Sequence, residues 1–97
     1  MLSHMPAVKL FHKKQLYQGG IIEMVIWRLS DVDPERPHGL KYGLVYVKDG
    51  RRLVGYDNER GKGDHKHIGD NEQAYAFQNV DQLLEDFWND AKRCEDD

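Results

Sequence analysis

The apolar pattern predicts two β-strands near the start of the chain, at residues 8–16 and 21–29. The second stretch is the more apolar and β-branched, and the alternation along residues 22–27 produces one wholly apolar face. Gln18-Gly19-Gly20 lies between the two stretches, and glycine readily adopts the positive φ of tight turns, so we predict a hairpin. Residues 30–39 hold two of the three prolines and one aliphatic side chain, which predicts an exposed loop.

Strand character returns at residues 40–47 and 51–57. Asp49-Gly50 joins these stretches, and this dipeptide is favoured in two-residue hairpin turns because both positions need a positive φ. We therefore predict a second hairpin. Residues 58–70 contain one aliphatic side chain, six charged residues and two histidines, which predicts a polar loop outside the core. A short extended piece at residues 75–77 is expected to add a further strand.

The last predicted element is an amphipathic helix that begins near Asn79. The Asn79 side chain can cap the first turn, and Gln82, three residues later, can complete a capping box. We expect Trp27 to pack beneath the helix rather than to form a stacking platform. The apolar residues at helical spacing form one stripe that must pack on the sheet: Val80, Leu83, Leu84, Phe87, Trp88 and Ala91.

These elements predict an α+β fold, with a four- to five-stranded, mainly antiparallel β-sheet of hairpins and one C-terminal α-helix packed on one face. A chain of 97 residues suffices for one hydrophobic core and not for two. We assign residues 6–93 to this single domain, residues 1–5 to a cloning remnant or disordered start, and residues 94–97 to an acidic tail.

The single cysteine, Cys94, excludes an intramolecular disulfide and a cysteine zinc cluster, which fits a reducing cytoplasm. No apolar run approaches the ~20 residues that a membrane-spanning helix needs, so we expect a cytoplasmic protein without membrane contact. An exposed sheet edge would permit a homodimer.

The net charge of −3 argues against coating of nucleic acid through bulk charge, but the charges are unevenly distributed. Residues 79–97 hold seven acidic and two basic residues, so the residues before them have a net charge of +2. The basic excess lies between Lys48 and His67. We predict that a polyanion would approach this segment.

Residues 55–67 combine glycines, charged residues and two histidines in a mixture that stability alone does not require. Gly61 and Gly63 flank Lys62, so their backbone amides could form an anion-binding nest; a flexible solvated loop is an equally good interpretation. His65 and His67 are two positions apart and would project to the same side of an extended segment. That placement suits a shared phosphate, a shared metal ion or two solvated rings.

Cleavage of RNA needs a base, an acid and a cation that stabilises the charge developing on the phosphoryl oxygens. We predict that these roles are distributed over His65, His67, Asp57, Asp64, Lys62 and Arg60. We predict nucleic-acid contacts for Tyr56, Asn58, Arg52 and Lys66. This scheme needs no cofactor. Its variant is a divalent metal ion at His65 and His67, with oxygen ligands from Asp57, Asp64 or Asp70.

Three segments resemble the TumE-type family of small toxins of prokaryotic toxin–antitoxin systems: residues 21–27 (IIEMVIW), 53–67 (LVGYDNERGKGDHKH) and 83–87 (LLEDF). The resemblance covers roughly residues 9–93, and the long central run is its most specific part. It implies a toxin whose partner is a helix-turn-helix DNA-binding antitoxin encoded nearby. Lys66 stands where the resemblance leads us to expect arginine, which keeps the charge but loses bidentate phosphate geometry.

Our leading hypothesis is a toxin that acts on RNA as a ribonuclease, and two alternatives stay open. A non-catalytic protein that only binds the antitoxin or a nucleic acid would fit the small size of the chain. A metal-assisted nuclease would require His65, His67 and one carboxylate to converge in space.

Overall fold

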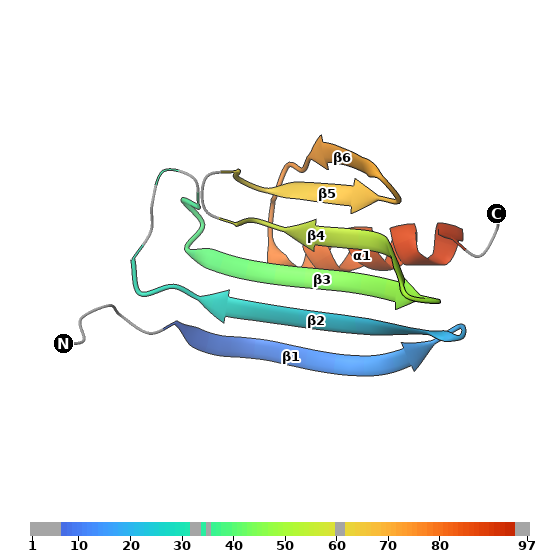
Figure 1. Ribbon diagram of the computed structural model, residues 1–97. Coiled ribbons are helices and arrows are strands. Elements are labelled where there is room, and N and C mark those ends of the chain that lie inside the picture. The colour runs from blue at the N-terminus through green and yellow to red at the C-terminus, as the bar shows by residue number, and fades with distance from the viewer. Residues whose placement is uncertain (1–6, 32–33, 35, 60–61, 95–97) are drawn as a thin grey trace.

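The computed structural model describes residues 7–31, 34, 36–59 and 62–94. In this part of the chain, six strands form one antiparallel sheet in chain order, and one helix packs on a face of it (Figure 1). The predicted α+β fold is confirmed, although the sheet has six strands rather than four or five. The elements are β1 (Val8–Tyr17), β2 (Gly20–Arg28), β3 (Leu40–Lys48), β4 (Arg51–Asp57), β5 (His65–Ile68), β6 (Asn71–Ala74) and α1 (Val80–Arg93).

Both predicted hairpin turns are present. Gln18 and Gly19 connect β1 to β2 with φ angles of 47° and 81°, and Asp49 and Gly50 connect β3 to β4 with φ angles of 54° and 74°. A positive φ at both central positions is typical of the type I′ turn, whose twist matches that of the flanking strands. Each hairpin sets the register of its own strand pair, β1 with β2 and β3 with β4.

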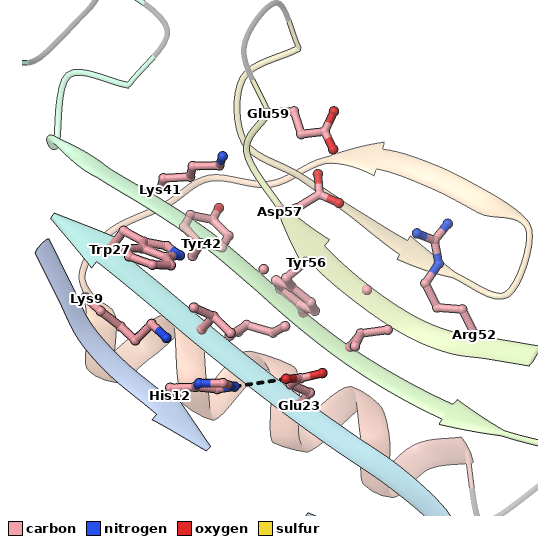
Figure 2. A pocket seen from close by; sticks show the side chains of 15 residues that line it. Lys9, His12, Glu23, Trp27, Lys41, Tyr42, Arg52, Tyr56, Asp57 and Glu59 are labelled. Atoms are coloured by element: carbon pink, nitrogen blue, oxygen red, sulfur yellow. Dashed lines mark hydrogen bonds and ion pairs between the residues drawn. The ribbon is translucent and has the colours of Figure 1, made fainter. Parts of the chain in front are cut away.

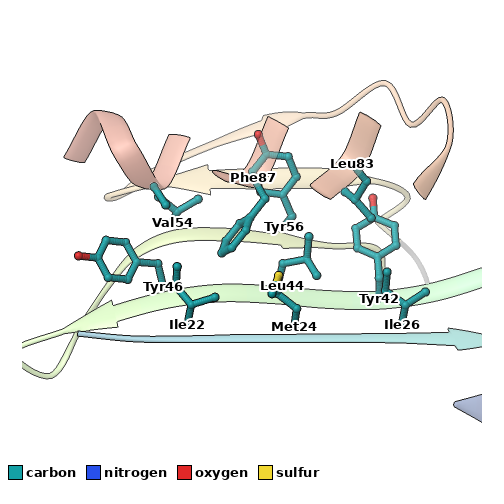
Figure 3. Close-up of a cluster of buried hydrophobic side chains, with 11 residues drawn as sticks. Ile22, Met24, Ile26, Tyr42, Leu44, Tyr46, Val54, Tyr56, Leu83 and Phe87 are labelled. Atoms are coloured by element: carbon teal, nitrogen blue, oxygen red, sulfur yellow. The ribbon is translucent and has the colours of Figure 1, made fainter. Parts of the chain in front are cut away.

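The hydrophobic core lies between α1 and one face of the sheet (Figure 3). The helix contributes its predicted apolar stripe, and β2, β3 and β4 contribute every second residue, because successive side chains of a strand point to opposite faces. The buried residues are Ile22, Met24, Ile26, Tyr42, Leu44, Tyr46, Val54, Tyr56, Leu83, Phe87 and Ala91. We call the other side of the sheet, which α1 leaves uncovered, the open face.

The expectation that Trp27 packs beneath the helix is wrong. Trp27 follows Ile26, which is 1% exposed in the core, so the strand pleat turns the indole to the open face. The ammonium group of Lys9 lies 5.0 Å from the centroid of the indole ring, within range of a cation–π interaction.

The prediction of a polar loop over residues 58–70 is wrong for its second half. His65–Ile68 form β5, which pairs with β4, and His65 is only 5% exposed. The free edge of β4 offers backbone hydrogen bonds that a polar segment can use as well as an apolar one. The further strand lies at Asn71–Ala74 instead of residues 75–77, which connect β6 to α1.

Two smaller expectations also need correction. The segment before β3 is not uniformly exposed, because Arg36 is 6% exposed. Asn79 caps α1 as predicted, with its Oδ1 atom accepting from the Gln82 backbone N–H at 2.8 Å. The Gln82 side chain, however, donates to Asp86 at 2.8 Å instead of returning to the cap, so the predicted capping box is incomplete.

Among the described residues, no helix is long and apolar enough to cross a membrane.

Candidate functional site

The sheet register brings together residues that lie apart in sequence. Asp57 of β4 is opposite His65 of β5, and His67 of β5 is opposite Glu72 of β6. Their neighbours Tyr56 and Lys66 face the helix, so Asp57, His65 and His67 project to the open face. We call these three residues the histidine cluster.

The cluster is tightly packed and largely buried. The Nε2 atom of His65 lies 2.6 Å from Oδ1 of Asp57, and the two imidazole centroids are 5.1 Å apart. The side chains of His65 and His67 are 7% and 14% exposed. Glu72 lies at the border, with its Oε2 atom 3.5 Å from Nε2 of His65 and 3.9 Å from Nε2 of His67.

A backbone contact orients the His65 ring. Nδ1 of His65 lies 3.1 Å from the carbonyl oxygen of Gly63, which can only accept, so Nδ1 carries the proton of this hydrogen bond. The other nitrogen, Nε2, is directed at Asp57. Both ring nitrogens of His65 are therefore directed at acceptor oxygens of the protein. Oδ1 of Asp57 is buried and has no hydrogen bond to any of the described residues.

A groove of about 500 Å³ runs over the open face beside the cluster (Figure 2). Asp57 belongs to both the groove and the cluster. Gly43 lies between Val25 and Asp57 in the register, and no atom lies within 4 Å of the place where its Cβ would be. Gly43 thus forms a low floor of the groove, and the side chains around it include Trp27, Lys41 and Arg52.

The charges of the groove are mixed rather than uniformly basic. Its lining includes the cations Lys9, Lys41 and Arg52 and the carboxylates Glu23, Asp57 and Glu59. At one end, Nε2 of His12 lies 2.9 Å from Oε2 of Glu23. This hydrogen bond is the main reason why the pKa of Glu23 is lowered. Desolvation opposes the shift, and the positive charges of Lys14 and His12 add to it.

The basic segment predicted from the sequence is divided between two faces of the sheet. Arg52 lines the groove, and the exposed Lys62 lies near the cluster, 3.8 Å from Oε2 of Glu72. Lys66 points the other way, with its Nζ atom 3.2 Å from Oδ2 of Asp90 on α1. Arg60, together with Gly61 of the predicted anion nest, lies outside the described residues.

Tyr56, a predicted nucleic-acid contact, is 1% exposed and lies in the core. Its hydroxyl donates a hydrogen bond to Asp90. The pKa of Tyr56 is raised, mainly by burial and then by this hydrogen bond and the negative charge of Asp90. Asn58, another predicted contact, is fully buried. It accepts from the Tyr42 backbone N–H at 3.0 Å and donates to the Leu40 carbonyl at 2.8 Å, so it ties the end of β4 to β3.

Asp64, a predicted catalytic carboxylate, does not belong to the histidine cluster. It accepts from the Tyr42 hydroxyl at 3.0 Å, and Nε2 of His38 lies 3.0 Å from its Oδ2 atom. Burial, then the charge and hydrogen bond of Asp64, raises the pKa of Tyr42. His38 also packs on Phe77, with ring centroids 4.1 Å apart, and the Asp64 carbonyl accepts from the Tyr75 backbone N–H at 3.0 Å. Asp64 therefore joins the loop before β3 to the linker before α1.

Several residues of the site were not predicted from the sequence, namely Glu72 at the cluster and Lys9, Trp27, Lys41 and Gly43 in the groove. For Glu72 a signal existed. Gly69-Asp70 is a two-residue connection between paired residues Ile68 and Asn71, and Gly69 has a φ of 59°. A hairpin at this point would have placed Glu72 opposite His67.

The fold and the cluster thus define a small α+β protein with a histidine–carboxylate site on an uncovered sheet face. Residues 4–95 match the family model described as Toxin TumE, and the chain belongs to the TumE toxin family. Membership in a toxin family implies an antitoxin partner. No curated protein and no solved structure matches the chain.

Proposed function

We propose that the chain is a toxin that cleaves RNA at the histidine cluster. The proposal rests on the convergence of Asp57, His65 and His67 on the open face, at one side of an exposed groove. One nitrogen or oxygen atom from each of these side chains lies within 4.8 Å of the other two. Paired imidazoles beside a carboxylate are suited to proton transfer near neutral pH. Because RNA is reached in the cytoplasm, we also propose that the toxin acts there.

The groove supplies the two kinds of contact that single-stranded RNA needs. Trp27 presents an aromatic face on which a base can stack, and Lys9, Lys41 and Arg52 supply cations for phosphates. The absence of a side chain at Gly43 leaves the floor low enough for a strand to lie across it. A backbone held in this way would pass Asp57, which joins the groove to the cluster.

The reaction that we propose is transesterification at phosphorus. The 2′-hydroxyl loses its proton, its oxygen bonds to the adjacent phosphorus, and the bond from phosphorus to the 5′-oxygen breaks, with a proton returned to that oxygen. Both nitrogens of His65 are directed at protein oxygens, so we assign to His67 the transfer of the proton from the 2′-hydroxyl and its return to the 5′-oxygen. The exposed ammonium group of Lys62 can stabilise the negative charge that develops on the phosphoryl oxygens.

Expression in a bacterial host tests the proposal. We compare wild type, His67→Ala and Lys13→Ala, and follow growth and total RNA over time. Lys13 is an exposed cation of β1 that does not line the groove, which makes it a matched control. We expect RNA to decay before growth stops with wild type and Lys13→Ala, and to persist with His67→Ala. Growth arrest with intact RNA would overturn the proposal.

We further propose that the antitoxin is a helix-turn-helix DNA-binding protein encoded beside the toxin. Family membership supports a partner, and β1 offers it an outer strand on which Val8, Leu10 and Leu16 are 49%, 48% and 83% exposed. Such an edge can also pair with a second copy of the chain, which would make a homodimer. Co-expression with the neighbouring gene, followed by purification through the toxin, tests the partner; recovery of the toxin alone or as a dimer would contradict it.

A further inference from the structure

The arrangement of protons in the histidine cluster leaves an electrostatic conflict. Because Nδ1 of His65 donates to the Gly63 carbonyl, a neutral ring has a lone pair on Nε2. This nitrogen lies 2.6 Å from Oδ1 of Asp57, which is also an acceptor. Two acceptors at that separation repel each other unless a positive charge lies between them or one of them is protonated.

The Asp57 carboxylate also lacks a donor. Its Oδ1 atom is buried and lacks a hydrogen bond to the described residues, although buried polar atoms are almost always paired. The close approach of His65 does not provide that hydrogen bond. A cation placed at this point would satisfy both the nitrogen and the oxygen.

The surrounding donors favour a metal ion over a single proton. His67 is on the same face two residues later, and it completes a set of three ligand atoms within 4.8 Å of one another. Glu72 brings Oε2 to within 3.5 Å of His65 Nε2 and 3.9 Å of His67 Nε2, where it can act as a fourth ligand. Two imidazoles with carboxylates are a common donor set for zinc and other divalent transition metals.

The supporting contacts of His65 are also those of a metal ligand. Histidines that bind metals usually donate their second ring N–H to a carbonyl or a carboxylate, and His65 does so to Gly63. Tetrahedral zinc with bonds of about 2.0–2.1 Å holds its ligand atoms about 3.3 Å apart. Asp57 and His65 would therefore separate by about 0.7 Å on binding, which is within the reach of small side-chain rotations.

We propose that Asp57, His65 and His67, joined by Glu72, bind one divalent transition-metal ion, with zinc as the best-fitting metal. Metal binding stands on the geometry alone, and only its use in RNA cleavage rests on the proposed function. If Glu72 left the fourth position to a water molecule, the bound ion would polarise that water for the reaction, and His67 would act as a ligand instead of transferring protons directly.

Calorimetric titration of the untagged, metal-free full chain with Zn²⁺ tests the proposal. We expect one Zn²⁺ per chain. Affinity should fall by at least about a hundredfold in His67→Ala, because loss of a direct ligand costs more than loss of an outer-shell partner. His12→Ala is the matched control, because it removes an exposed imidazole that is paired with Glu23 away from the cluster. We expect it to bind Zn²⁺ like wild type. Absence of saturable binding, or equal loss of affinity in His12→Ala, would overturn the proposal.

Two further measurements separate this proposal from the proposed function. Asp57→Asn keeps the size of the side chain and loses its charge, so we expect weaker Zn²⁺ binding even if the folded structure is retained. RNA cleavage is then measured with both the metal-free chain and the Zn²⁺-loaded chain. Zn²⁺ binding without any RNA cleavage would support the metal site and overturn the proposed function. Cleavage by a chain that fails to bind Zn²⁺ would do the reverse.

Discussion

The ammonium group of Lys66 lies 3.2 Å from Oδ2 of Asp90, across the interface between β5 and α1. Lys66 separates His65 from His67 in the chain, so a strand that directs the lysine to the helix directs both imidazoles to the open face. Asp90 is 6% exposed and also accepts from Tyr56. The ion pair therefore anchors β5 in the orientation that assembles the histidine cluster.

Replacing Lys66 with alanine should lower the free energy of unfolding by about 1–3 kcal/mol, because a buried carboxylate loses a charged partner. Arg93→Ala is the control: Arg93 contacts the other oxygen of Asp90 at 2.9 Å, but its side chain is 75% exposed. Its loss should cost less than about 1 kcal/mol. Denaturant unfolding measures both values, and equal losses would contradict the assignment of Lys66 as the buried anchor.

Replacing Gly43 with valine should obstruct the groove without harming the fold. Nothing lies within 4 Å of a Cβ built at Gly43, and β-branched residues suit a strand. We expect an unchanged or higher melting temperature and weaker binding of a short single-stranded RNA, measured by fluorescence anisotropy. Gly43→Ala, which fills less space, should have an intermediate effect. RNA affinity that is equal in all three proteins would place the RNA elsewhere.

Asn58 should matter for stability, in contrast to the nucleic-acid contact that its place in the sequence motif predicts. Asn58→Ala removes the partners of the Tyr42 N–H and the Leu40 carbonyl, which should cost about 2–4 kcal/mol. Asn71→Ala, at an exposed asparagine of β6, should change the free energy of unfolding by no more than about 0.5 kcal/mol. Thermal or denaturant unfolding compares the two. An Asn58→Ala variant with wild-type stability would contradict this structural role.

Three tyrosines should make the protein sensitive to alkaline pH. Burial, as the largest cause, raises the pKa values of Tyr42, Tyr56 and Tyr75. In the unfolded chain these phenols lose their protons above about pH 10, whereas in the folded chain they retain them. The folded state then binds more protons, so the free energy of unfolding falls as the pH rises above about 10.

Tyr75→Phe tests this pH dependence, because it removes the one of these three phenols that lies at the edge of the core. The variant should show a shallower loss of stability above about pH 10 than wild type. The ultraviolet absorbance of tyrosinate provides an independent measurement. If all tyrosines of the folded protein ionise with a pKa near 10, the explanation fails.

The sequence alone determined the features that depend on near neighbours. The turns at Gln18-Gly19 and Asp49-Gly50 could be predicted because each contains a glycine, which readily adopts a positive φ. The start of α1 at Asn79 could be predicted because a local side chain satisfies a free backbone N–H. The common orientation of His65 and His67 follows from the two-residue period of an extended chain.

Only the tertiary structure decided which residues of separate elements met on each face of the sheet. The docking of α1 buried Tyr56 and directed Lys66 to Asp90, which removed both from the predicted nucleic-acid surface. The pairing of β6 with β5 brought Glu72 to His67, and Asp64 was bound instead by Tyr42 and His38. These outcomes depend on contacts between distant parts of the chain. Local residue preferences carry no information about such contacts, because the energy that selects them arises only when the elements pack together.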